Sequence, residues 1–372
     1  MKTAVAMSGG VDSSTAAALI RENGSDAFGI TMRLFPAPGE TGHGKGLPLP
    51  VAGARRGRCC GGDDTEVARR AAHALDLPFY VLDFEAEFRS LVVDPFTASY
   101  HQGRTPIPCS ECNTLLKFDH LLRRVRGMGA EQLATGHYAR IGRDPVSGRC
   151  TLSRGVDVDK DQSYFLHGLT QETLEHVLFP VGALSKQEVR ERARNHGLPN
   201  ADKPESQDIC FIPDGDYRSF VQRQDPRPDT AGEIVDTEGR TLGRHEGISR
   251  FTVGQRRGLG LAGGEPYYVL ALDAARRRVV VGPRERALSS SLHTGRVNWV
   301  SCPVPGRPLE CEVQVRHRHQ PAEATVTPQH DGTAAVAFAR PVLAPAPGQT
   351  AVFYHGDLLL GGGPIEGTAG GL

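Results

Sequence analysis

The string Ser8-Gly9-Gly10-Val11-Asp12-Ser13-Ser14 is the feature that most constrains the fold of this chain. It lies between an apolar run at residues 3–7 and the helix-forming residues 15–20, so it predicts a strand, a glycine turn and a helix start. Adjacent glycines let backbone N–H groups converge on an anion, and the serine hydroxyls and the helix N-terminus strengthen that attraction. The lysine of a Walker loop is missing. The string therefore predicts a pyrophosphate-binding turn, and a plain tight connection is the alternative.

Length and composition limit the number of domains and the kinds of partner that we expect for this chain. With 372 residues, 39% of them hydrophobic, the chain is long enough for two or three domains that each have a core. Lys+Arg and Asp+Glu both number 43, so RNA binding would depend on local patches such as 276–278 or 316–318. No apolar run has the length of a membrane span, and Met1-Lys2 leads directly into the first predicted strand. We therefore expect a cytoplasmic protein with no membrane partner.

Strands and helices alternate from the start of the chain to about residue 141. The predicted strands are 3–7, 27–34, 79–84 and 132–134, and the predicted helices follow Asp12 and cover 65–75 and 114–128. This order is typical of a parallel α/β sheet. The stretch 35–62 is rich in Gly, Pro and Arg, and it predicts either a mobile insertion over the ligand-binding edge or a passive loop.

The pattern changes after about residue 204. A helix that opens with a capping box, Ser185 and Glu188, ends near Gly197 and closes the first domain. A strand pair at 233–242 then introduces β structure, and the alternating segment 310–318 predicts a strand with Gln314, Arg316 and Arg318 on its polar face. We expect an α/β domain at 1–204, a β-rich middle domain at 205–284 that starts with the Cys210 segment, and an antiparallel β-barrel or sandwich at 285–372.

The cysteines are too few for a disulfide scaffold, so their individual chemistry matters more. In Cys109-Ser110-Glu111-Cys112, the second cysteine directly precedes a predicted helix with Asn113 as its N-cap. The helix dipole and Lys117 would favour the thiolate of Cys112, which makes it a candidate nucleophile. Two small loop residues are the alternative for this Cys-x-x-Cys.

Cys210 lies in a polar loop at the predicted domain boundary, and taken alone it would be a small buried hydrophobe. The remaining cysteines lie in contexts where packing is the better interpretation, and we assign them no chemistry: Cys59, Cys60, Cys150, Cys302 and Cys311.

Read together in this order, several segments resemble the bacterial tRNA-specific 2-thiouridylases, a branch of the PP-loop ATP pyrophosphatases. The segments are 8–14, 105–113, 136–138, 160–165 and 210–212, followed by 251–260, 315–320 and 347–354. The resemblance covers nearly the whole chain. It implies 2-thiolation of the wobble uridine, position 34, in the tRNAs for lysine, glutamate and glutamine.

The resemblance also implies an ATP site and a first chemical step. The phosphate-binding residues would be Ala6, Met7, Ser8, Gly9, Gly10, Val11, Asp12 and Ser13, and Met32 and Gly136 would flank the adenine and ribose. Mg²⁺ would bridge the phosphates. The uridine O2 would attack the α-phosphate in the first domain, which leaves a base with an electrophilic C2.

Sulfur delivery is implied for two cysteines. Cys210 would receive a persulfide sulfur from an upstream sulfur carrier or cysteine desulfurase, and its terminal sulfur would attack C2. Cys112 would complete the transfer, either by forming a disulfide with Cys210 or by releasing hydrosulfide. The two thiols form one site only if the Cys210 loop folds over the ATP cleft, and we expect tRNA binding to order it.

Contacts to tRNA follow from the same resemblance. Ile107, Pro108 and Cys109 would lie near the target base, and the further contacts would be His137, Lys160, Asp161, Gln162, Arg316, His317 and Gln349, the last three from the C-terminal barrel. Without the resemblance these residues would be interpreted as a solvated turn, ordinary surface charge and a core histidine.

The chain departs from the family pattern at two positions. Some members have an aspartate where this chain has Cys109, so a general acid or base role does not transfer; Ile107 replaces a common polar amide. Cys109, Cys112 and Cys210 together open a second route, in which they hold a [4Fe–4S] cluster with one open iron for sulfide.

Two other functions use fewer of these residues. An ATP-dependent amidating ligase of the argininosuccinate or guanylate synthetase kind needs only the PP-loop, and it leaves Cys112 and Cys210 without a role. A tRNA-binding protein that uses ATP to hold its shape would not be an enzyme. AMP release with and without tRNA separates this last possibility from catalysis.

Overall fold

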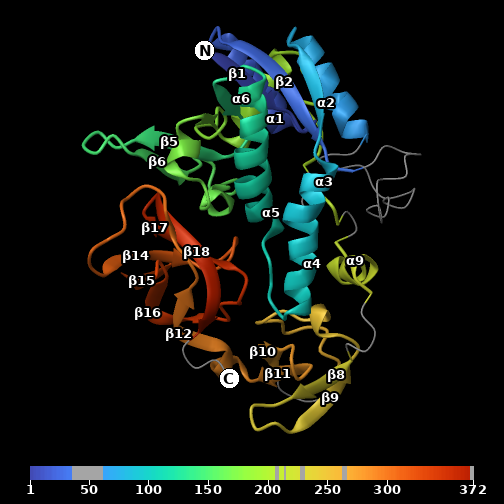
Figure 1. Cartoon of the computed structure of the whole chain (residues 1–372), viewed down its shortest axis with the longest axis vertical. Coiled ribbons are helices and arrows are strands. Elements are labelled where there is room, and N and C mark those ends of the chain that lie inside the picture. The colour runs from blue at the N-terminus through green and yellow to red at the C-terminus, as the bar shows by residue number, and fades with distance from the viewer. Residues whose placement is uncertain (36–61, 206–208, 213–214, 227–230, 262–265, 369–372) are drawn as a thin grey trace. The chain divides into compact units, whose positions relative to one another are not determined.

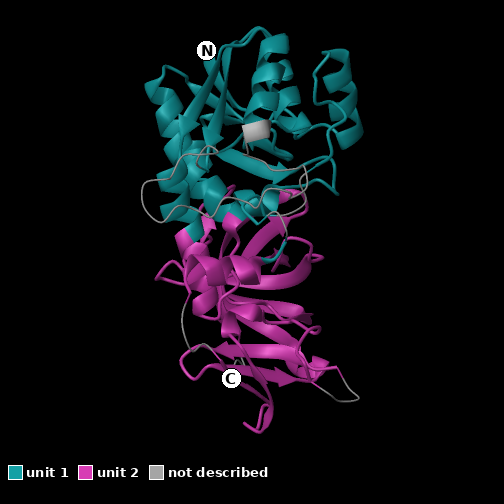
Figure 2. Ribbon diagram, turned by 90° about the vertical axis from the view of Figure 1, so that its right-hand side faces the viewer, with its two compact units in different colours: residues 1–93, 109–216 teal, residues 94–108, 217–372 magenta. Residues whose placement is uncertain are grey.

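The computed structural model describes residues 1–35, 62–205, 209–212, 215–226, 231–261 and 266–368. The predicted insertion at 35–62 lies almost entirely outside these residues. The chain separates into two compact units, coloured in Figure 2: residues 1–93 with 109–216, and residues 94–108 with 217–372. Each unit has its own hydrophobic core.

The first unit contains the predicted parallel sheet (Figure 1). Its strands are β1 (Lys2–Ala6), β2 (Asp26–Arg33), β3 (Phe79–Asp83), β4 (Gln132–Ala134) and β7 (Val177–Leu178), in the order β3-β2-β1-β4-β7. All neighbouring pairs are parallel. Because β1 has β2 on one side and the later strand β4 on the other, the strand order reverses there, and ligands of α/β proteins bind at the carboxyl ends of strands beside such a point.

Helices pack their alanine-rich faces against this sheet. The helices α1 (Val11–Glu22), α2 (Gly62–Ala74) and α8 (Lys186–Asn195) share one core, in which Ala16 and Ala17 of α1 meet Val189 and Ala193 of α8. The small side chains of α1 let α8 approach closely. The capping box of α8 is confirmed, because Ser185 and Glu188 each accept a hydrogen bond from the other's backbone N–H. No helix of the described ranges is long and apolar enough to cross a membrane.

Shorter elements complete the first unit. They are α3 (Glu85–Phe88), η1 (Arg89–Val93), the antiparallel hairpin β5 (Ala139–Arg143) and β6 (Cys150–Arg154), η3 (Ser163–Leu166) and α7 (Gln171–Leu174).

The helix around the Cys-x-x-Cys starts earlier than predicted. Helical backbone begins at α5 (Pro108–Glu111) and continues through the π-helical η2 (Cys112–Leu121) and α6 (Leu122–Gly127). Proline at the first helical position needs no N–H partner, which favours this early start. Cys112 therefore lies one turn inside the helix and Asn113 is not its N-cap, so the expected dipole effect acts on Cys109 more directly. π-Helical turns are rare in proteins, and those that occur are often found at functional sites.

The second unit begins with helices and a small sheet. It contains α4 (Asp94–His101), α9 (Tyr217–Gln224), η4 (Ile248–Arg250) and η5 (Arg284–Ala287). Its sheet has the order β10-β11-β8-β9, made by β8 (Gly232–Val235), β9 (Thr241–His245), β10 (Tyr268–Asp273) and β11 (Arg278–Gly282). The predicted strand pair at 233–242 is confirmed as the antiparallel hairpin of β8 and β9.

The C-terminal part of the second unit is a closed antiparallel barrel. Its strands are β12 (Leu288–Thr294), β14 (Leu309–Gln314), β15 (Ala322–Pro328), β16 (Ala334–Leu343), β17 (Thr350–His355) and β18 (Leu358–Thr368), with the short β13 (Asn298–Trp299) paired to β18. The order is β12-β16-β15-β14-β17-β18, and β12 pairs with β18 to close the ring. The sequence was compatible with either a barrel or a sandwich. The pairing of β12 with β18 closes the sheet and shows that this part of the chain is a barrel.

One strand of the barrel ends sooner than the alternating pattern predicts. Cys311, Val313 and Val315 are buried as expected, but β14 ends at Gln314, which is itself buried rather than on a polar face. The side-chain amide of Gln314 donates to the carbonyls of Arg316 and His317 and holds them in a turn. Arg316 and His317 therefore lie in a turn after the strand, and the prediction that the strand reaches residue 318 is wrong.

Candidate active site

The predicted pyrophosphate loop joins β1 to α1 at the carboxyl edge of the parallel sheet. Gly9 has φ +75°, a left-handed conformation that glycine adopts at no steric cost, and α1 starts at Val11. The Ser13 hydroxyl donates to the Gly10 carbonyl at 3.0 Å and accepts from the Ser8 backbone N–H at 3.1 Å. The loop is thus braced from within, and the serine and glycine string forms the strand, turn and helix start that the sequence predicts.

Gly136 lies directly against this loop. A Cβ atom at residue 136 would sit 2.6 Å from the backbone of Asp12 and Ser13, so only glycine fits there. Gly136 follows the end of β4, and Met32 is buried near the end of β2, so both lie toward the carboxyl edge of the sheet. The structure therefore gathers the expected ATP-binding residues at one edge.

A second set of residues, which the sequence analysis missed, clamps the opposite side of the loop. The Asn200 side-chain amide donates to the Gly9 carbonyl at 3.1 Å and to the Ser14 hydroxyl at 2.9 Å. Lys203 Nζ donates to the same Gly9 carbonyl at 3.1 Å and forms an ion pair with Asp64. Asn200 and Asp64 are buried. Because carbonyls point away from an anion that N–H groups bind, this clamp supports the loop from behind.

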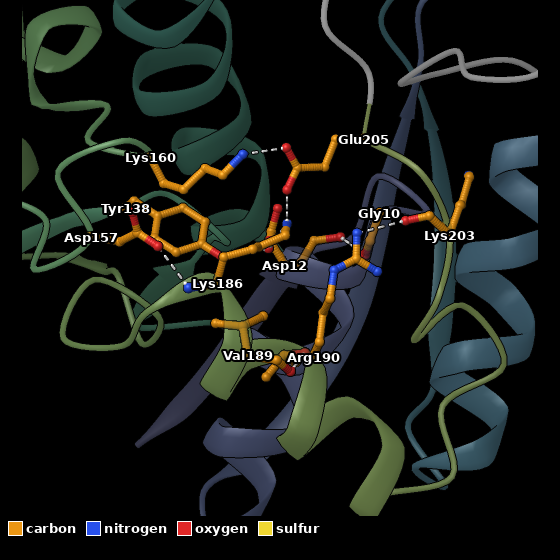
Figure 3. A network of polar contacts seen from close by, with 12 residues as sticks. Gly10, Asp12, Tyr138, Asp157, Lys160, Lys186, Val189, Arg190, Lys203 and Glu205 are labelled. Carbon is orange, nitrogen blue, oxygen red and sulfur yellow. Dashed lines mark hydrogen bonds and ion pairs between the residues drawn. The ribbon is translucent and has the colours of Figure 1, made fainter.

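A chain of charged groups lies on the other flank of α1's first turn (Figure 3). Lys186 Nζ is 2.7 Å from Asp12 Oδ1 and 2.6 Å from Glu205 Oε1. Lys160 Nζ is 2.7 Å from the other oxygen of Glu205, and the Tyr138 hydroxyl donates to Asp12 Oδ1 at 2.7 Å. Asp12 and Lys160 belong to the predicted site, whereas Lys186 and Glu205 were not predicted.

The electrostatics of this chain keep its members in defined protonation states. Burial acts to raise the pKa of Glu205, but the hydrogen bonds from Lys160 and Lys186 outweigh it and hold that pKa below its usual value. Burial, reinforced by the charge of Asp12, raises the pKa of Tyr138 far above its usual value. Glu205 is therefore a carboxylate and Tyr138 a hydroxyl donor at neutral pH.

The predicted tRNA-contacting turn at 160–162 is tied into the same network. Asp161 accepts hydrogen bonds from Arg154, Ser163 and the Gly155 N–H, so its carboxylate is occupied within the protein. Gln162 Oε1 accepts from the Tyr138 backbone N–H at 3.0 Å. This turn is held against the residues around Asp12 instead of lying free in solvent.

His137 has the surroundings of a core residue. Its Nδ1 lies 2.6 Å from the Thr135 hydroxyl, and its ring contacts Phe118 and Phe179 at centroid distances of 5.5 and 5.6 Å. Burial, reinforced by the charge of Lys117, lowers the pKa of His137 well below its usual value. The ring is therefore neutral at pH 7.

The two cysteines expected to carry sulfur belong to the same unit, and both are half-buried thiols, whereas Cys109 is exposed. Lys117 was expected to assist Cys112, and its Nζ donates to Asn113 Oδ1 at 3.0 Å. Asn113 in turn donates to the Phe165 carbonyl at 3.2 Å, which anchors the start of η2.

The described residues do not bring the three cysteines of the cluster route together, and the other cysteines lie in packing positions. Among the residues with described positions, no three His, Cys, Asp or Glu side chains are grouped to hold a metal ion, so Cys109, Cys112 and Cys210 are not gathered as cluster ligands. Cys150 and Cys311 are buried, and burial raises the pKa of Cys311 to about 12, in keeping with a packing role. Cys59 and Cys60 lie outside the described residues.

One predicted tRNA contact of the second unit, Gln349, holds the segment that leads into α5. The Gln349 side-chain amide donates to the Thr105 carbonyl at 3.0 Å, and the Thr105 N–H donates to the Pro347 carbonyl at 2.8 Å. Ile107 and Pro108 follow directly in the chain. Arg316 donates to the Leu343 carbonyl at 3.1 Å.

Family models match nearly the whole length of the chain in three parts. Residues 1–214 match the tRNA methyl transferase HUP domain, residues 218–283 its PRC-barrel domain, and residues 289–365 the aminomethyltransferase beta-barrel domain. The part of the second unit that contains strands β8 to β11 thus matches a PRC-barrel domain.

Curated relatives match over nearly the same length. A tRNA-specific 2-thiouridylase MnmA of Acidobacterium capsulatum is 49% identical, covering 97% of this chain and 98% of the relative. Another, of Geotalea uraniireducens, is 47% identical, and the match covers 98% of this chain and 95% of the relative. A solved 4-thiouridine synthetase in complex with RNA and ATP is 15% identical, covering 60% of this chain and 50% of that one, with a TM-score of 0.33.

Proposed function

Because the chain belongs to the family of tRNA-specific 2-thiouridylases, and is thus an ATP-dependent tRNA sulfurtransferase, we propose that it thiolates C2 of the wobble uridine, position 34. Its substrates would be the tRNAs for lysine, glutamate and glutamine. The observation that carries this proposal is the braced glycine loop at the carboxyl edge of the sheet, with Gly136 against it and two thiol-bearing segments in the same unit. An amidating ligase would leave Cys112 and Cys210 without a role.

ATP would bind along the loop from Ala6 to Ser13, next to Met32 and Gly136. The loop's N–H groups and the N-terminus of α1 would hold the phosphates, together with Mg²⁺. The uridine O2 would attack the α-phosphate, forming a new P–O bond while the bond to the β-phosphate breaks and pyrophosphate leaves. This step makes C2 electrophilic, because its oxygen now leaves as AMP.

Sulfur would follow from Cys210. An upstream sulfur carrier or cysteine desulfurase would supply the outer sulfur of a Cys210 persulfide, whose terminal sulfur attacks C2 and expels AMP. The Cys112 thiolate would then attack the inner sulfur of Cys210, forming a disulfide and releasing 2-thiouridine; a cellular thiol would reduce that disulfide. Ring contact of Phe211 with Phe88, at a centroid distance of 5.6 Å, supports this placement because it anchors the residue next to Cys210 within the same unit.

The finer assignments complete the proposal. The predicted contacts to tRNA are Ile107, Pro108, Cys109, His137, Lys160, Asp161, Gln162, Arg316, His317 and Gln349. We place the reaction in the cytoplasm, where tRNA is available. The hydrogen bond from Gln349 to Thr105 supports a role in holding the base-contacting segment.

Mass spectrometry of digested tRNA tests the function directly. The protein is incubated with ATP, Mg²⁺, a sulfur donor and unmodified glutamate tRNA. We expect 2-thiouridine with the wild type, none with Cys210→Ser or Cys112→Ser, and wild-type amounts with Cys302→Ser, a control thiol in the second unit. Both inactive variants should still release pyrophosphate in a tRNA-dependent manner, because adenylation of the uridine precedes sulfur transfer.

Two results would contradict the proposal. Full sulfuration by Cys210→Ser would remove that residue from sulfur delivery. Stoichiometric iron and broad visible absorbance in anaerobically purified, active protein would replace the persulfide route by the cluster route, whereas colourless active protein supports the persulfide.

A further inference from the structure

Lys186 occupies a position that is unfavourable for a cation. Its ammonium pairs with Asp12 in the first turn of α1, so it lies near the N-terminus of that helix. Helix N-termini carry partial positive charge and repel a cation. Two carboxylates, Asp12 and Glu205, compensate for this repulsion, and only 13% of the Lys186 side chain is exposed.

We propose that Lys186 binds the β- or γ-phosphate of ATP, and that the Glu205 carboxylate holds its ammonium until the nucleotide displaces it. This inference rests on the proposed use of ATP and adds a phosphate-binding residue to it. The loop itself has no Walker lysine, and Lys186 supplies an equivalent charge from 174 positions further along the chain.

Glu205 already shows the kind of ligand that fits here. Each of its two oxygens accepts from one lysine, Lys186 at 2.6 Å and Lys160 at 2.7 Å, as two oxygens of one phosphate would. A terminal phosphate carries more charge than a carboxylate, so it competes for the same ammonium groups. When a phosphate binds, the Lys186 ammonium therefore exchanges its contact with Glu205 for a contact with the phosphate.

The other lysine near the loop does not fit this role. Lys203 Nζ donates to the Gly9 carbonyl and pairs with Asp64. A group that satisfies a loop carbonyl lies on the side away from the anion, because the N–H groups of the same turn point to the opposite side. Lys203 thus supports the loop, whereas Lys186 lies on the side of Asp12.

Nucleotide binding in the absence of tRNA tests the inference. We expect Lys186→Met to raise the Kd for ATP by about 10- to 100-fold, the loss of one charge-assisted contact, and to change the Kd for AMP by less than about twofold. Lys186→Arg should recover most of the ATP affinity. Arg194→Met, which removes an exposed cation from the same helix, should bind both nucleotides like the wild type.

Glu205→Gln gives an effect of the opposite sign. The amide keeps the shape of Glu205 but competes less for Lys186, so we expect ATP to bind up to about tenfold more tightly and AMP unchanged. If Lys186→Met alone unfolds because Asp12 and Glu205 lose their partner, the double variant Lys186→Met/Glu205→Gln restores charge balance and should show the same selective loss of ATP affinity.

Two results would overturn the inference: ATP binding by Lys186→Met within about twofold of the wild type, or an equal loss of ATP and AMP affinity in a folded variant. Failure of the proposed function looks different. If no 2-thiouridine forms in any assay but Lys186→Met still weakens ATP binding and not AMP binding, the thiolation proposal is wrong and the role of Lys186 is supported.

Discussion

Asn200 donates its side-chain amide to the backbone carbonyl of Gly9 at 3.1 Å, although 191 positions separate the two residues in the chain. The same amide donates to the Ser14 hydroxyl, so one buried side chain fixes both ends of the glycine turn. This contact holds the turn in a shape that its own sequence allows but does not enforce.

Removing that amide should destabilise the first unit. We expect Asn200→Leu to lower the free energy of unfolding by about 1–3 kcal/mol, because the Gly9 carbonyl and the Ser14 hydroxyl lose a buried donor. Urea denaturation measures the change. Asn195→Leu, at an exposed position of α8, should alter the unfolding free energy by less than about 0.5 kcal/mol, and equal effects at both positions would argue against the clamp.

Gly136 should not tolerate a side chain. In Gly136→Ala the new Cβ would lie 2.6 Å from the backbone of Asp12 and Ser13, so α1's first turn must shift. We expect a loss of about 1–3 kcal/mol of stability and at least about tenfold weaker ATP binding, measured by denaturation and calorimetry. Gly127→Ala, at the end of α6 with open space around it, should be neutral or stabilising by up to about 1 kcal/mol.

Gln349 should affect tRNA and not ATP. Its amide donates to the Thr105 carbonyl and so fixes the segment that carries Ile107 and Pro108. We expect Gln349→Ala to raise the Kd for tRNA by about 3- to 10-fold, the equivalent of one hydrogen bond, in filter binding, with ATP binding unchanged. Gln329→Ala removes an exposed amide that donates to Thr327 in the same unit, and a similar loss there would contradict this role for Gln349.

Stability should fall on mild acidification. Burial lowers the pKa of both His137 and His167, so they stay neutral in the folded protein while the unfolded chain takes up protons below about pH 6.5. Each histidine therefore lowers the free energy of unfolding by up to about 1.4 kcal/mol for each pH unit below about 6.5, until the pH reaches its pKa in the folded protein. Urea denaturation from pH 7.5 to 5.0 should show the decline, and His137→Gln should make it shallower.

A flat stability profile between pH 7.5 and 5.5 would show that neither histidine resists protonation. Carboxylates whose pKa is lowered in the folded protein do not contribute to this decline. Hydrogen bonds that lower the pKa of groups such as Asp83 and Glu188 cost stability only when the pH falls below their unfolded values, near 4.

Local patterns predicted much of the fold because their physical causes are local. The glycine and serine string favours a turn at its own position, the capping box of α8 uses residues three apart, and the hairpin of β8 and β9 follows from a short turn. The alternation of apolar and polar residues wrongly placed Gln314 on the exposed face of its strand. A buried amide that donates to two nearby carbonyls can take the place of an apolar side chain. The helix start at Pro108 was missed because Asn113 also has the chemistry of an N-cap.

The sequence by itself determined the phosphate-binding turn, the order of strands and helices in the first unit, and the family of the chain. Only the tertiary structure decided which side chains support that turn: Asn200 and Lys203 behind it, and Lys186 with Glu205 beside it. It also decided that β12 pairs with β18 to close a barrel. Partners more than 170 positions apart in the chain meet through packing, and no pattern of neighbouring residues encodes that meeting.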